Sequence, residues 1–160
     1  MDYASRLRRA ALLVLAGSVL TLAGAWYFQW WLGYVPCKLC LQERIPYYAA
    51  IPLALLGLLL PAWATRLVLG LAALGLLSGA GLSVYHAGAE WSLWAGPTDC
   101  GGGAGANPDA VGDFLNTLQT TRVADCSTAA WRLAGISLAG WNALIAFVLA
   151  SIAGTAALKR

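Results

Sequence analysis

Apolar and charged residues alternate along this chain in long blocks. Four stretches of at least about 20 residues, the length a helix needs to cross a bilayer core of about 30 Å, contain no charged side chain. A backbone in lipid must satisfy its own hydrogen bonds, so these stretches are expected to be helices. The pattern predicts an all-α membrane protein, a four-transmembrane-helix bundle with spans at 10–30, 45–64, 67–88 and 134–157.

Composition supports a single membrane domain over residues 1–160. Hydrophobic residues make up 60% of the chain and charged residues only 11%, whereas a soluble domain has about a quarter of its residues charged. Two loops, 31–44 and 89–132, connect the predicted spans on one side. In the longer loop, Asn107 and Pro108 resemble a helix start and apolar residues follow at helical spacing. We therefore expect a short interfacial helix there.

Charge asymmetry predicts the orientation of the chain. The end of the bundle that holds both termini and the loop near Arg66 has a net charge of +5, and the opposite end has a net charge of −2. By the positive-inside rule both termini are cytoplasmic, and all four cysteines then lie on the outer face of the membrane. The net positive charge of the chain follows from its membrane topology, so we expect membrane lipid and no nucleic acid as a partner.

The first apolar segment has an alternative interpretation as a cleavable signal peptide. Arginines precede it, and Ala23-Gly24-Ala25 resembles a cleavage site. The apolar run continues beyond that site through a group of aromatic residues, which is typical of a membrane anchor with an interfacial belt. The anchor is the preferred interpretation.

Turns and small residues suggest how the helices meet. A minimal turn is expected at Thr65-Arg66, and the prolines at 52 and 61 should bend or end the second span. Gly75 and Gly79 lie four residues apart in the third span, a spacing that allows helices to approach closely in lipid. Glycine is also common in membrane helices without such a role.

The four cysteines are the candidate reactive groups. Cys37 and Cys40 form a C-x-x-C motif, and Cys100 and Cys126 lie in the long loop. Thiols pair on the oxidising side of a membrane, so two disulfides are expected. Three pairings are possible, and the closeness of Cys37 and Cys40 in sequence favours 37–40 with 100–126.

The lengths of the closed loops help to separate structural from reactive bridges. A bridge between Cys37 and Cys40 would stabilise the fold by roughly 2 kcal/mol, and one between Cys100 and Cys126 by about 3.6 kcal/mol. The short bridge would therefore stabilise the fold less than the long one, and C-x-x-C pairs commonly serve in thiol exchange. A zinc site of four cysteines usually has two close pairs. Only Cys37 and Cys40 are close in this chain, so no metal is expected. Two inert disulfides remain an alternative.

Charged residues beside the cysteines suggest an electron acceptor. If a helix begins after Cys40, its dipole favours a thiolate there, and Arg44 lies on the same face. Arg44 could also donate hydrogen bonds to a carbonyl ligand. His86 is predicted at the same depth, and balancing charge is the alternative role for Glu43. Because no flavin or nicotinamide signature is present, we expect a lipid-soluble quinone between the helices, with Arg44 and His86 as candidate contacts and Glu43 as a weaker one.

The chain resembles the disulfide bond formation protein B (DsbB) family nearly end to end. The resemblance rests on P-C-K-L-C-L-Q-E-R at 36–44, on His86 with W-S-L-W-A-G-P-T-D-C at 91–100, and on A-D-C-S-T-A-A-W-R-L-A-G-I-S-L-A-G-W-N at 124–142. It implies an enzyme of the bacterial inner membrane that reoxidises a DsbA-like periplasmic thiol oxidase and passes the electrons to ubiquinone or menaquinone. The segment between the last two cysteines is unusually rich in Gly and Ala, so partner docking could differ in detail.

The resemblance also implies a role for each cysteine. Cys100 would form the mixed disulfide with the partner, and Cys126 would be its pair. The Cys37–Cys40 disulfide would reoxidise that pair, and Cys40 would react with the quinone with the help of Arg44.

Two rival functions are compatible with parts of the sequence. Reductases of the vitamin K epoxide reductase type share a four-helix bundle and C-x-x-C chemistry, but there the motif usually falls late in the bundle, whereas here it follows the first span. A structural membrane protein with two inert disulfides is the non-enzymatic alternative.

Overall fold

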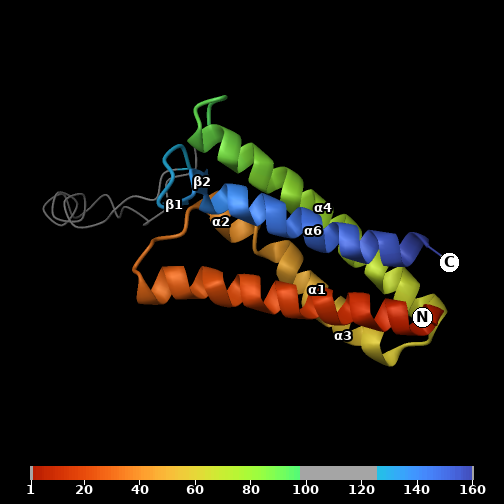
Figure 1. Cartoon of the computed structure of the whole chain (residues 1–160). Coiled ribbons are helices and arrows are strands. Elements are labelled where there is room, and N and C mark those ends of the chain that lie inside the picture. The colour runs from red at the N-terminus through yellow and green to blue at the C-terminus, as the bar shows by residue number, and fades with distance from the viewer. Residues whose placement is uncertain (1, 98–125, 160) are drawn as a thin grey trace, which may run out of the picture.

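The computed structural model describes residues 2–97 and 126–159 and shows a bundle of long helices. Figure 1 shows α1, α3, α4 and α6 running along one long axis, with both termini at one end and α2 and the small sheet at the other. The predicted helix in the long loop and Cys100 lie outside the described residues. The order of elements is α1 Tyr3–Trp26, the π-helix η1 Tyr27–Trp31, α2 Lys38–Gln42, α3 Ile45–Leu59, α4 Ala62–Glu90, β1 Arg132–Leu133, β2 Ile136–Ser137 and α6 Leu138–Leu158.

Three of these helices have the length and apolar composition of membrane spans: Tyr3–Trp31, Ala62–Glu90 and Leu138–Leu158. Many large apolar side chains face outward, for example Leu20, Leu59 and Leu74. A soluble monomer rarely exposes so much contiguous apolar surface, so these faces fit lipid. The chain is a helical membrane protein, as predicted.

The second predicted span is shorter than expected. Helix α3 ends at Leu59 rather than at 64, and its 15 residues give a length of only about 22 Å. Pro61 is the reason, because a proline forces the preceding residue out of the helical region, and Leu60 is extended (φ −83°, ψ 158°). Pro52, by contrast, lies inside α3 without ending it.

The predicted turn at Thr65-Arg66 is therefore wrong, and both residues belong to α4. The buried hydroxyl of Thr65 donates to carbonyl oxygens of the Leu60–Pro61 turn and of Gly57. The Arg66 guanidinium donates to the carbonyl oxygen of Ala157 near the end of α6, where a cation is favoured by the helix dipole.

The last span also begins later than predicted. A two-stranded hairpin occupies 132–137, and its turn needs left-handed backbone at Ala134 (φ 52°) and Gly135 (φ 81°). Ser137 then caps α6, because its Oγ accepts from the N–H of Gly140 at 3.2 Å.

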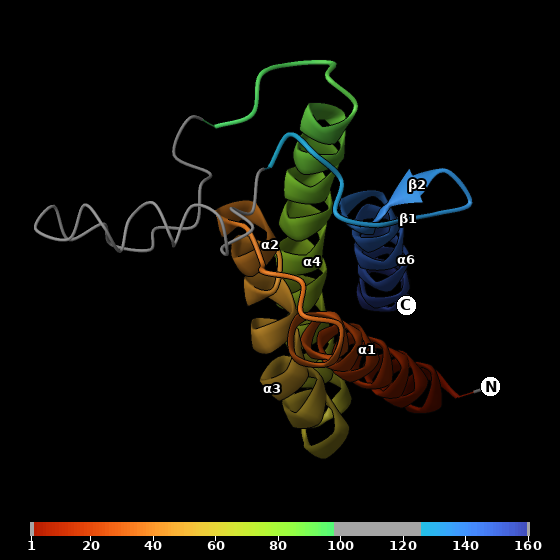
Figure 2. The ribbon, with the colours of Figure 1, turned by 90° about the vertical axis from the view of Figure 1, so that its left-hand side faces the viewer.

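Helix α4 is central to the packing. It packs against both α3 and α6, and Figure 2 shows it standing between them. Gly79 allows the close approach that its spacing predicted, because an added Cβ would lie 2.9 Å from Cγ of Pro46. Gly75 faces open space, so its predicted packing role is wrong. The apolar core joins residues of all four long helices, including Leu7, Tyr47, Leu76 and Leu149.

Candidate active site

Cys37 caps the N-terminus of α2. Its backbone is extended (φ −75°, ψ 171°), and its Sγ accepts a hydrogen bond from the N–H of Cys40 at 3.2 Å. The sequence predicted a helix beginning after Cys40, but α2 begins at Lys38. The C-x-x-C spacing explains the difference. It places the N–H of Cys40, which has no partner within the first helical turn, beside the sulfur of Cys37, so that Cys37 can cap the helix.

The two sulfurs of the C-x-x-C motif touch each other. Cys37 and Cys40 are free thiols whose Sγ atoms lie 2.7 Å apart. The hydrogen bond from Cys40 lowers the pKa of Cys37, and His86 and the Cys40 N–H lower it further. The same sulfur contact, together with burial, raises the pKa of Cys40. In the reduced pair the thiolate therefore belongs to Cys37, and oxidation of the pair to a disulfide stays a prediction.

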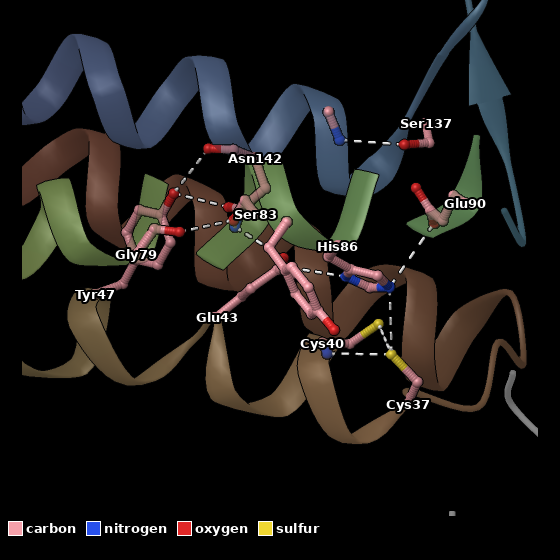
Figure 3. Close-up of polar contacts among 12 residues, drawn as sticks. Cys37, Cys40, Glu43, Tyr47, Gly79, Ser83, His86, Glu90, Ser137 and Asn142 are labelled. Atoms are coloured by element: carbon pink, nitrogen blue, oxygen red, sulfur yellow. Dashed lines mark hydrogen bonds and ion pairs between the residues drawn. The ribbon is translucent and has the colours of Figure 1, made fainter. Parts of the chain in front are cut away.

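His86 lies between a carboxylate and a sulfur. Its Nδ1 is 2.7 Å from Oε1 of Glu43 and its Nε2 is 3.7 Å from Sγ of Cys37, as Figure 3 shows. Glu90, one turn further along α4, places Oε1 3.9 Å from the same Nε2. Cys40, Arg44 and His86, which the sequence predicted at one depth, do lie near one another. The ring of His86, however, contacts the sulfur of Cys37.

Glu43 belongs to a buried polar network that joins three helices. Its Oε2 accepts from Nδ2 of Asn142 on α6 at 3.0 Å, and that amide also donates to Ser83 on α4 at 2.8 Å. Tyr47 on α3 donates to Oδ1 of Asn142 at 2.7 Å. Burial raises the pKa of Glu43, while the hydrogen bond to His86 opposes that rise.

Cys126, from the segment before β1, lies at the same place as the C-x-x-C motif. It is buried and disulfide-bonded, and its Sγ, that of Cys37 and a ring nitrogen of His86 all lie within 4.8 Å of one another. A small movement would bring the two sulfurs into contact, so thiol exchange between the loops is geometrically possible.

A cavity of about 650 Å³ opens beside these groups. Both C-x-x-C cysteines line it with Arg44 and His86, and most of the remaining wall is apolar, including Phe28 and Trp141. A flat apolar ring with carbonyl oxygens fits such a wall, because it needs apolar contact and a few donors.

Arg44 reaches this cavity from the first residue before α3. Its Nη1 donates to Oε1 of Gln29 at 2.7 Å, and Gln29 lies in the π-helical turn that ends the first span. Such turns are frequent at functional sites. Among the contacts of the described residues, the guanidinium is thus fixed by Gln29. Its predicted roles, stabilising a thiolate or donating to a carbonyl ligand, stay predictions.

The sequence reasoning missed the polar partners inside the helices. Gln29, Tyr47, Ser83 and Asn142 are polar residues within otherwise apolar spans, a feature that by itself indicates a functional or structural polar site in a membrane protein. Glu90 was counted only as a charge, although its side chain is almost fully buried.

Comparisons with known proteins agree with the geometry. The family described as "Disulfide bond formation protein DsbB" matches residues 7–156. "Disulfide bond formation protein B 2" of Pseudomonas aeruginosa is 31% identical over 155 residues, which cover 92% of this chain and 89% of the relative. "Disulfide bond formation protein B" of Marinobacter nauticus is 33% identical over 138 residues, 82% and 79% of the two chains.

A third relative shows the same level of similarity. "Disulfide bond formation protein B" of Pasteurella multocida is 30% identical over 152 residues, covering 86% of this chain and 78% of the relative. No solved structure matches the chain. With the matched residues spanning nearly the whole sequence, this chain belongs to the DsbB family of disulfide-forming oxidoreductases of the bacterial inner membrane.

Proposed function

We propose that this protein reoxidises a periplasmic DsbA-like dithiol oxidase and passes the two electrons to a membrane quinone, ubiquinone or menaquinone. The observation that carries the proposal is the cavity that both C-x-x-C cysteines share with Arg44. A quinone accepts two electrons and two protons. The chain would hold its ring against the apolar wall and orient one carbonyl toward the Arg44 guanidinium.

The positions of the sulfurs support a relay between two cysteine pairs. Cys100 would receive the electrons from the partner dithiol, and Cys126 would pass them on. The Sγ of Cys126 lies within 4.8 Å of that of Cys37, so the thiolate of Cys126 could attack the Cys37–Cys40 disulfide. Cys40, which also lines the cavity, would then deliver the electrons to the quinone.

The proposal includes a topology. Residues 1–160 would form one domain with both termini in the cytoplasm and the cysteines in the periplasm, because the end with more positive charge stays inside. Helix α3, although short, would cross most of the bilayer as the fourth span, assisted by α2 and the intervening turn. Helix α3 packs against both α1 and α4, which supports its place in the bundle.

The decisive experiment uses the purified full chain with a reduced DsbA-like protein and a soluble ubiquinone or menaquinone analogue. We expect the quinone absorbance to fall in proportion to the disulfide formed, and Cys40→Ser to abolish this turnover. Tyr48→Phe, at a half-exposed site on α3, serves as the control and should turn over normally. Unchanged quinone reduction in Cys40→Ser would refute the relay.

The rival functions predict other outcomes. An epoxide-reductase-like enzyme would take electrons from a dithiol to reduce its quinone substrate without oxidising a DsbA-like partner. A structural protein would keep both cysteine pairs unreactive toward a mild dithiol.

A further inference from the structure

We propose that Glu43, His86 and Cys37 form a proton-accepting triad, in which His86 takes the thiol proton of Cys37 and Glu43 holds the imidazole ring in the tautomer that can accept it. This inference rests on the proposed function, because the triad serves the dithiol that is reoxidised. It gives His86 a role toward sulfur and makes Glu43 a positioning residue.

The two ring contacts of His86 define the tautomer. A carboxylate can only accept hydrogen bonds, so the 2.7 Å contact between Oε1 of Glu43 and Nδ1 places the hydrogen of the neutral ring on Nδ1. The lone pair then lies on Nε2, which faces Sγ of Cys37 at 3.7 Å. An acceptor nitrogen beside a thiol, with a carboxylate behind the ring, is the arrangement that activates cysteine and serine nucleophiles.

The carboxylate is itself held in place. Each oxygen of Glu43 has one donor, Nδ1 of His86 on Oε1 and Nδ2 of Asn142 on Oε2. The orientation of Asn142 is fixed in turn, since its Oδ1 accepts from the Tyr47 hydroxyl. With this network the ring cannot turn without breaking its hydrogen bond to Glu43.

The groups that face His86 come from several elements. The titratable ones among the described residues are Glu43 from the turn before α3, Cys37 from the start of α2 and Glu90 from its own helix. The disulfide-bonded Cys126 from the segment before β1 is also close but does not titrate, and Asn142 of α6 contributes a neutral amide to the same network. An imidazolium at His86 would therefore lie between two anionic groups, the Glu43 carboxylate and the Cys37 thiolate.

The proton and electron balance of the step is simple. The Cys37 thiol gives its proton to Nε2 of His86, which leaves a thiolate and an imidazolium. When the Cys37–Cys40 disulfide closes, two electrons leave for the quinone-class acceptor, and the two protons come from His86 and from the Cys40 thiol. His86 is then neutral again and ready for the next cycle.

A quinone-free assay tests the triad separately from the proposed function. In a Cys100→Ser/Cys126→Ser background only Cys37 and Cys40 can react. The full chain is reduced, freed of reductant and mixed with 4,4′-dithiodipyridine, a small uncharged disulfide that can enter the cavity. Attack by the Cys37 thiolate releases one thiopyridone, and closure by Cys40 releases a second, so the absorbance records the rate as a function of pH.

The triad predicts two graded losses. His86→Gln should slow the first release at pH 7 by about 10²-fold, the lower end of general-base effects, and should move the rising limb of the pH profile to higher pH. Glu43→Gln should slow it roughly ten-fold and move the limb in the same direction, because the ring loses its fixed tautomer. Thr65→Val, which removes a buried hydroxyl at the far turn, should lower stability and leave the limb where it is.

Two results would overturn the triad. One is a rising limb of the pH–rate profile that stays in place in His86→Gln. The other is a limb that moves in Thr65→Val as much as in Glu43→Gln, because the shift would then reflect lost stability. If the limb moves as expected but the native chain reduces no quinone, the triad stands and the proposed acceptor fails.

Discussion

The hydroxyl of Tyr47 donates to Oδ1 of Asn142 at 2.7 Å across 95 positions of sequence. This bond joins α3 to α6. Tyr47 is 1% exposed, so its hydroxyl has little access to water as an alternative partner.

Tyr47→Phe should therefore destabilise the protein by about 1–3 kcal/mol, because Asn142 would keep a buried acceptor without its donor. Thermal unfolding of the purified protein in detergent measures the effect. Tyr48→Phe is the matched control, since Tyr48 is half-exposed and its hydroxyl only accepts from Trp26 at 3.2 Å. Equal melting temperatures for the two variants would contradict the role of the Tyr47–Asn142 bond.

Two of the glycines of α4, Gly75 and Gly79, offer a second matched pair. Gly79→Ala should destabilise by about 1–3 kcal/mol, because its Cβ would press on Pro46 at the start of α3. Gly75→Ala meets no atom within 4 Å and should be neutral or stabilising by up to about 1 kcal/mol through helix propensity. Thermal unfolding distinguishes the two, and a loss of stability in Gly75→Ala would show that lipid or another chain packs there.

Arg44 and Gln29 should act together on the quinone. Arg44→Ala should raise the apparent quinone KM more than the KM for the dithiol partner. Gln29→Ala should raise it less, because the guanidinium remains but loses its 2.7 Å anchor. Steady-state kinetics with both substrates measures this. An unaltered quinone KM in Arg44→Ala would remove Arg44 from the site.

The reduced protein should become more stable as pH rises toward 9. The folded structure lowers the pKa of Cys37 from its ordinary value of 9.0, mainly through the Cys40 hydrogen bond. Between the lowered pKa and 9.0 the unfolded chain binds more protons than the folded chain, so the free energy of unfolding increases with pH across that window. This added stability is lost as pH falls through the folded pKa. Melting temperatures of the reduced protein and of reduced Cys37→Ser, taken from pH 5 to 8, should diverge. Parallel curves would mean that Cys37 is an ordinary thiol.

Much of the membrane architecture could be predicted because charge is excluded from lipid. The spans ending near Trp31 and Glu90 were found from their charge-free stretches alone. The helix ends could not be placed in this way. Pro61 moved a turn by five residues, from 65–66 to 60–61, through its effect on Leu60, and the hairpin at 132–137 replaced the expected first turn of the last span.

The site was predicted less completely for a related reason. Cysteine spacing pointed to the C-x-x-C pair, and the charged neighbours Glu43 and Arg44 drew attention by their rarity. Spacing along one helix could not show that Arg44 would meet Gln29 of η1, or that Glu43 would meet His86 and Asn142. Those partners come from other helices, so only the assembled bundle reveals them.

The interlocked contacts of Glu43, Tyr47, Ser83, His86 and Asn142 limit how this sequence can drift. Replacing any single member removes a hydrogen-bond partner from another one inside the bundle. During divergence these positions should consequently be kept or exchanged as a set, while the lipid-facing residues around them vary freely. In a library of variants, tolerated changes at 43 should be accompanied by compensating changes at 86 or 142.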